Sequence, residues 1–117
     1  MKENKIWGET RLIWSGNNTE THQIKIKKGG YCSKHKHLYK YNLFYIDRGK
    51  LLIETWKENG IVDETLLIPG ESTIVGPGQY HRFKALEQTN ALEVYWVDLK
   101  EGDIIREDCG GLLKGKK

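Results

Sequence analysis

Apolar and polar residues alternate along this chain with a period of two, which is the period of a β-strand and not of a helix. Ile24 and Ile26, for example, alternate with Lys25 and Lys27, so we expect a strand with one apolar and one wet face. No stretch has the 3.6-residue pattern of a helix of three turns. Strands are predicted over residues 5–15, 22–27, 43–47, 51–56, 61–68, 72–75, 81–85 and 92–99. Many short strands joined by turns predict an all-β sandwich or barrel, among which jelly rolls are common.

Two turns are readable from the sequence. Asn59-Gly60 stands between the strands predicted over 51–56 and 61–68. Asn-Gly readily supplies the two positive φ angles of a type I′ turn, so we predict a β-hairpin closed by that turn. We interpret Asn17-Asn18-Thr19, which has the form of a glycosylation sequon, as turn sequence.

The length of 117 residues fits one domain. We expect a barrel over about residues 5–100 and a C-terminal extension over 101–117, frayed from about 112. No apolar run approaches the roughly 20 residues that span a bilayer, and the N-terminus has no apolar signal core, so we expect a cytoplasmic protein without a membrane partner. The only cysteines, Cys32 and Cys109, lie far apart, which fits free thiols in a reducing compartment.

The net charge of +3 favours a small anionic molecule as partner. Nucleic-acid binding would need a dense basic stripe and a recognised module, and the sequence displays neither. We therefore expect no nucleic-acid partner. The lysines that alternate with apolar residues are interpreted as a solvated outer face.

Three histidines suggest a metal site. His35 and His37 are separated by one residue, and positions i and i+2 of a strand point to the same face. His81 follows the turn sequence Pro77-Gly78, which can start a strand that brings it beside the first two. Neutral imidazoles suit zinc, iron, nickel, copper or manganese. The alternative is a barrel interior in which the histidines hydrogen-bond to one another, to Tyr39 or Tyr41, or to water.

The same residues resemble the two motifs of the cupin superfamily. The first motif is matched by Gly30, His35, His37, Asn42 and Gly49, and the second by Gly70, Pro77, Gly78 and His81. Both matches lie within residues 30–81. The resemblance implies a single jelly-roll barrel, the cupin double-stranded β-helix. It also implies that the three histidines hold one divalent metal ion per chain, for which Zn, Mn, Fe and Ni are the candidates.

The chain departs from the cupin pattern at two positions. Asn42 stands where the family usually has a glutamate ligand, and Ala85 stands where an asparagine ends the second motif. An asparagine offers a carbonyl oxygen without charge, so Asn42 would be a weak fourth ligand. The metal would then keep its full charge and favour an anionic substrate group. The alternative is that the metal was lost together with the glutamate.

The two ends resemble the cupin domain of type II mannose-6-phosphate isomerases, at Ile6-Trp7-Gly8 and over residues 103–111. This resemblance implies an isomerase or epimerase that acts on a phosphorylated sugar or sugar nucleotide. Our candidates for moving the proton are Glu93, Tyr95 and Tyr41. Our candidates for substrate binding are Arg82, Tyr80 and Arg106.

Two other functions stay open. Three-histidine sites without a carboxylate also occur in cupin-type thiol dioxygenases, so an iron-dependent dioxygenase is one alternative. The other is a non-catalytic cupin that binds a sugar or another small ligand among its tryptophans. In each case we expect a homodimer, because pairing removes an exposed strand edge, and the strand over residues 5–15 is our candidate for the contact.

Overall fold

The computed structural model describes residues 2–97, so the predicted extension, Arg106 and Cys109 lie outside the described residues. Those residues form strands and turns, and no helix among them is long and apolar enough to cross a membrane. The strands are β1 (Lys2–Lys5), β2 (Gly8–Gly16), β3 (Thr19–Ile26), β4 (Tyr41–Arg48), β5 (Leu51–Trp56), β6 (Val62–Leu67), β7 (Ser72–Val75), β8 (Tyr80–Ala85) and β9 (Thr89–Trp96).

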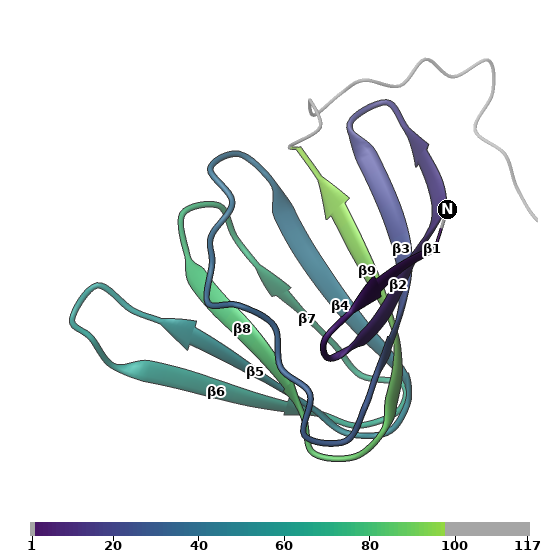
Figure 1. Ribbon diagram of the computed structural model, residues 1–117. Helices are drawn as coiled ribbons and strands as arrows, with labels where there is room; N and C mark the ends of the chain where they lie inside the picture. The colour runs from purple at the N-terminus through teal and green to yellow at the C-terminus, as the bar shows by residue number, and fades with distance from the viewer. Residues whose placement is uncertain (1, 98–117) are drawn as a thin grey trace, which may run out of the picture.

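The strands form two antiparallel sheets that face each other. A six-stranded sheet has the order β1-β2-β3-β9-β4-β7, and a three-stranded sheet has the order β6-β5-β8. Figure 1 shows the sheets as two walls that converge at one end and open at the other. The all-β fold class predicted from the two-residue period is confirmed.

The apolar core lies between the two sheets. Ile24 and Ile26 are buried while Lys25 between them is exposed, as the alternation predicts. Burying each isoleucine side chain stabilises the fold by roughly 1.5–3 kcal/mol. On the opposite wall Leu51 and Ile53 are buried in the same way, so both sheets contribute alternate residues to one core.

The N-terminal strand predicted over residues 5–15 is in fact two strands. β1 folds back on β2 with Lys5 opposite Gly8, and a turn at Ile6 and Trp7 separates them. Trp7 packs edge-on against Phe83 at 5.0 Å between ring centroids. A Cβ at Gly8 would collide with the carbonyl of Lys25, so only glycine permits this close approach. β1 is an edge strand, and the homodimer stays a prediction.

The β5–β6 hairpin is confirmed, with Trp56 opposite Val62, but its predicted type I′ turn is wrong. The connection is longer than two residues, and the amide of Gly60 donates to the carbonyl of Lys57 at 2.9 Å. Gly60 alone takes a positive φ there, of 82°. Positive φ angles at two successive residues occur instead at Asn17 and Asn18 (44° and 70°), in the turn between β2 and β3.

Candidate metal centre

The segment that carries His35 and His37 runs beside β8 without belonging to a named strand. His35 pairs with His81 in an isolated antiparallel bridge, and Tyr31 pairs with Lys84 in another. The amide of Cys32 donates to the carbonyl of Phe83 at 3.3 Å. The backbone therefore binds residues 31–35 to β8, and this pairing brings the HxH pair to the third histidine.

The three imidazoles converge on one point. The ring centroids of His35 and His81 lie 4.5 Å apart, and the ring of His37 lies 5.1 Å from His35 and 5.4 Å from His81. One nitrogen from each ring lies within 4.8 Å of the other two. A metal with bonds of about 2.1 Å holds neighbouring nitrogens about 3–3.5 Å apart. Small ring rotations would reach that spacing.

Two of the rings are held with Nε2 free to bind. The Nδ1 of His35 lies 2.7 Å from the carbonyl of Ser33, and the Nδ1 of His81 lies 3.0 Å from the carbonyl of Gln79. A carbonyl only accepts, so each Nδ1 carries the proton and donates it. The lone pair is then on Nε2, which is the usual arrangement of histidines that bind metals.

Buried polar atoms without a partner support the same site. Within residues 2–97, the buried side-chain atoms that lack a hydrogen bond are His37 Nε2, Asn42 Oδ1 and His81 Nε2. Leaving such an atom unpaired costs about 1–3 kcal/mol. The Oδ1 of Asn42 and the Nε2 of His81 have free lone pairs, and all three atoms belong to predicted ligands. A cation held by the histidines would satisfy the two Nε2 atoms, so the residues present fit a metal ion.

Burial favours the neutral form of His81 and His37. Burial lowers the pKa of His81 to about 4, despite the hydrogen bond to Gln79. The pKa of His37 is lowered too, by burial and then by the neighbouring His35. A neutral imidazole needs to lose no proton before it binds a metal, so at pH 7 these two rings are ready to do so.

A buried carboxyl group lies on the wall beside the histidines. Glu93 on β9 is 9% exposed, and burial raises its pKa, while hydrogen bonds from Tyr95 and Asn42 oppose the rise. The ring of Tyr95 lies 5.1 Å from that of His37, which places this pair next to the metal centre. A buried carboxyl group with a raised pKa is suited to hold and move a proton.

An open cavity of about 790 Å³ leads to this wall. His35, Glu93 and Tyr95 line it, and so does His22, which the sequence did not single out. His22 stands opposite Glu93 in the β3–β9 register. Its alternation with Ile24 was the signal that it faces inward. Lys5, Lys27 and Lys28 also line the cavity. Lys5 is paired with Glu3 at 3.3 Å, so Lys27 and Lys28 supply the charge that makes the cavity attractive to anions.

The chain is similar in structure to several solved proteins. No protein-family model and no curated protein matches the sequence. KdgF from Halomonas sp. has a TM-score of 0.72 at 14% identity, over 86% of this chain and 89% of its own. A cupin superfamily protein from Desulfitobacterium hafniense has a TM-score of 0.67 at 13% identity, over 84% of both chains. The fold is that of the cupin superfamily.

A larger protein contains the same cupin unit. Oxalate decarboxylase from Bacillus subtilis has a TM-score of 0.75 at 18% identity, over 83% of this chain. The match spans only 27% of the decarboxylase. Identities this low bear on the fold alone, and the cupin fold hosts many chemistries.

Three of the predicted site residues lie on the outer faces of this fold. Tyr41 stacks on Trp96 with ring centroids 5.6 Å apart, on the face opposite Asn42. Arg82 follows the inward His81 and therefore points outward, where its guanidinium donates to Glu54 at 3.0 and 3.2 Å. Tyr80 is 43% exposed on the same outer face. The fold does not bring these three to the histidines.

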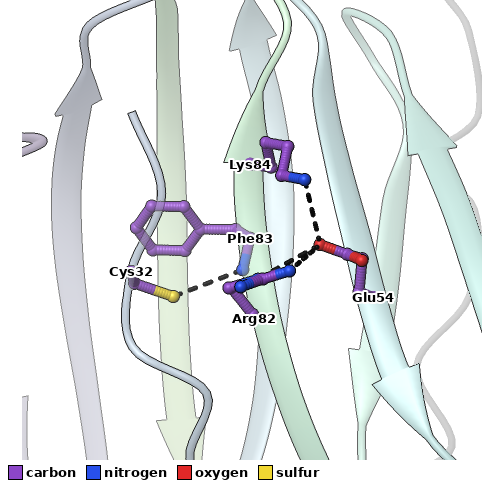
Figure 2. A network of polar contacts seen from close by, with 5 residues as sticks. All are labelled: Cys32, Glu54, Arg82, Phe83 and Lys84. Atoms are coloured by element: carbon purple, nitrogen blue, oxygen red, sulfur yellow. Dashed lines mark hydrogen bonds and ion pairs between the residues drawn. The ribbon is translucent and has the colours of Figure 1, made fainter. Parts of the chain in front are cut away.

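Cys32 has the environment of a packing residue. It is buried, and its Sγ accepts the amide of Phe83 at 3.2 Å, as Figure 2 shows. Burial raises its pKa to about 11. The thiolate is the form that binds metals and reacts, so at neutral pH this thiol packs in the core and is unreactive.

Proposed function

We propose that this chain is a metal-dependent cupin that binds one divalent ion through His35, His37 and His81 and acts on a small anionic substrate. The observation that carries this proposal is the set of unpaired atoms. Two of them are histidine Nε2 atoms in a cluster whose nitrogens lie within 4.8 Å. Asn42 completes the set and would be a neutral fourth ligand.

The charges around the site support an anionic substrate. The donor set of three imidazoles and an amide is neutral, so it leaves the metal its full positive charge. Three lysines line the adjoining cavity. A phosphate, carboxylate or enediolate entering there would meet the positive charge of the lysines in the cavity and that of the metal ion at the histidines. When bound, a divalent ion supplies Lewis-acid polarisation of a substrate carbonyl.

We propose Glu93 as the group that moves the proton. Glu93 lines the cavity together with His35, and its raised pKa brings it closer to the range of an effective general base at neutral pH. Tyr95 and Asn42 hydrogen-bond to it and would hold it in position. Abstraction of a proton from one carbon and its return to the next would interconvert an aldose and a ketose.

The substrate class follows from the resemblance of the chain ends to type II mannose-6-phosphate isomerases. A phosphorylated sugar or a sugar nucleotide would place its anionic group among the lysines and its carbonyl near the histidines. The missing carboxylate ligand favours a second candidate, an iron-dependent dioxygenase. Manganese is a further candidate metal, since Bacillus subtilis oxalate decarboxylase has Mn(II) centres.

Elemental analysis of protein purified without chelator tests the site. We expect about one equivalent of metal per chain, lost in the double variant His35→Ala/His37→Ala and retained in His22→Ala, whose imidazole lies outside the cluster. The element found distinguishes isomerase-like from iron oxygenase chemistry. A protein that contains no metal and takes none up on titration would overturn the metalloprotein proposal and leave a ligand-binding barrel.

The reaction is tested by proton exchange. With the metal-loaded protein in deuterated water, we expect NMR to show deuterium entering the carbon next to the carbonyl of an aldose or ketose phosphate. Glu93→Gln should keep the metal and lose this exchange. Exchange at the wild-type rate in Glu93→Gln would remove Glu93 from the proposal, and oxygen uptake with a thiol would favour the dioxygenase.

A further inference from the structure

The outer face of the three-stranded sheet gathers cations and aromatic rings. In the β5–β8 register Trp56 stands opposite Tyr80, and Glu54 stands opposite Arg82. These four side chains point away from the metal centre, because their neighbours along each strand point inward. The segment that precedes β4 then adds lysines over the same face.

The cations lie directly over the rings. The Nζ of Lys34 is 4.3 Å from the ring centroid of Trp56 and 5.5 Å from that of Tyr80, and the Nζ of Lys36 is 4.7 Å from Tyr80. The guanidinium carbon of Arg82 is 5.5 Å from Trp56 and 5.6 Å from Tyr31. We call this alternating row the cation ladder, and its members in order are Tyr31, Arg82, Trp56, Lys34, Tyr80 and Lys36.

The carboxylate beneath the ladder is already neutralised. The side chain of Glu54 is 11% exposed, and its Oε1 lies 3.0 Å from Arg82 and 3.7 Å from Lys84. Figure 2 shows both cations converging on this oxygen. The nearest other acid in the sheet register is Glu64, which pairs with Glu54 on the side away from β8. The ladder itself therefore presents positive charge.

The rings hold the cations in place. Each cation–π contact attracts the cation to the negative face of the ring. It also restricts a long side chain, which lowers the entropy cost of ordering that side chain in a complex. Trp56 and Tyr80 each contact two cations. A partner that stacks bases or sugar rings would have to displace them.

We propose that the cation ladder docks an extended acidic segment of a partner protein. Carboxylates complement a row of fixed cations without needing the ring faces, and electrostatic complementarity of this kind gives specificity and fast association. The ladder lies on the face of β8 opposite His81, so this surface is separate from the proposed metal centre. An experiment can therefore reject one of the two proposals without affecting the other.

Fluorescence anisotropy with a dye-labelled glutamate-rich peptide tests the proposal, with the same peptide in glutamine form as the ligand control. We expect Lys34→Ala/Lys36→Ala to weaken binding about tenfold at low salt. The matched variant Lys25→Ala/Arg48→Ala removes two exposed cations from the other sheet and should change the affinity less than about twofold. Trp56→Leu keeps every charge but removes a ring, and should weaken binding by an intermediate factor.

Three results would overturn the proposal. They are absence of peptide binding, an equal loss in the two double variants, and tighter binding of an oligodeoxythymidine than of the peptide. An equal loss would mean that only net charge matters, and tighter oligonucleotide binding would indicate a nucleic-acid surface. Lys34 and Lys36 flank His35, so the metal content of their double variant is measured in parallel. An unchanged content shows that its effect on the peptide arises at the ladder.

Discussion

His35 and His81 exchange two backbone hydrogen bonds. The amide of His35 donates to the carbonyl of His81 at 3.1 Å, and the amide of His81 donates to the carbonyl of His35 at 2.8 Å. This pairing sets their rings 4.5 Å apart. Two ligands of the proposed metal are therefore positioned by the backbone. The third, His37, is separated from His35 by one residue.

Metal binding should stabilise the folded chain. A ligand that binds only the native state, at one hundred times its dissociation constant, adds about 2.7 kcal/mol to the free energy of unfolding. Urea unfolding with added metal and with chelator measures the difference. We expect the stabilisation in the wild type and in His22→Ala, and none in His35→Ala/His37→Ala. Equal curves for the wild type with and without metal would contradict the site.

Asn42→Asp should bind metal more tightly than the wild type, by at least about tenfold, because a carboxylate adds a charged ligand that asparagine lacks. Asn42 is fully buried, so without metal the same change should destabilise the protein, since an unpaired buried charge is costly. Competition with a coloured chelator measures the affinity, and urea unfolding measures the stability. An unchanged metal affinity would mean that Oδ1 of Asn42 does not face the ion.

Much of the site was predictable because its signals are local. The spacing of His35 and His37, and the turn before His81, predicted three converging imidazoles, and the cluster has that form. The placement of Arg82 in the same site conflicted with that of His81, because neighbours in a strand point to opposite faces. Tyr41 precedes the inward Asn42, so the same alternation points its side chain to the opposite face.

The cation ladder was beyond prediction because it depends on tertiary register. Lys34, Trp56 and Arg82 come from three separate segments, and nothing in their spacing indicates that they meet. His22 shows a different limit. Its inward direction followed from its alternation with Ile24, but its neighbour Glu93 is known only from the β3–β9 pairing.

Gly49→Ala should destabilise the fold by about 1–3 kcal/mol. Gly49 has a φ of 94°, and a Cβ there would collide with the carbonyl oxygen of Gln88 and meet Oγ1 of Thr89 at 2.6 Å. Gly29→Ala is the matched control, because Gly29 also has a positive φ, of 81°, but open space around it. It should cost only about 1 kcal/mol. Thermal unfolding of both variants measures the difference, and equal losses would contradict the steric argument.

Glu93→Gln should make the metal-free protein more stable at pH 7. The pKa of Glu93 is raised above its ordinary value of 4.5, so between the two pKa values the folded chain binds more protons than the unfolded chain. Stability from this group is then present below pH 4.5 and lost as the pH rises through the folded pKa. Glutamine does not ionise, so the variant does not lose stability in this way. The difference in the free energy of unfolding between the variant and the wild type should therefore disappear near pH 4.5. Urea unfolding across this range measures it, and a variant less stable than the wild type at pH 7 would show that Glu93 supports the fold.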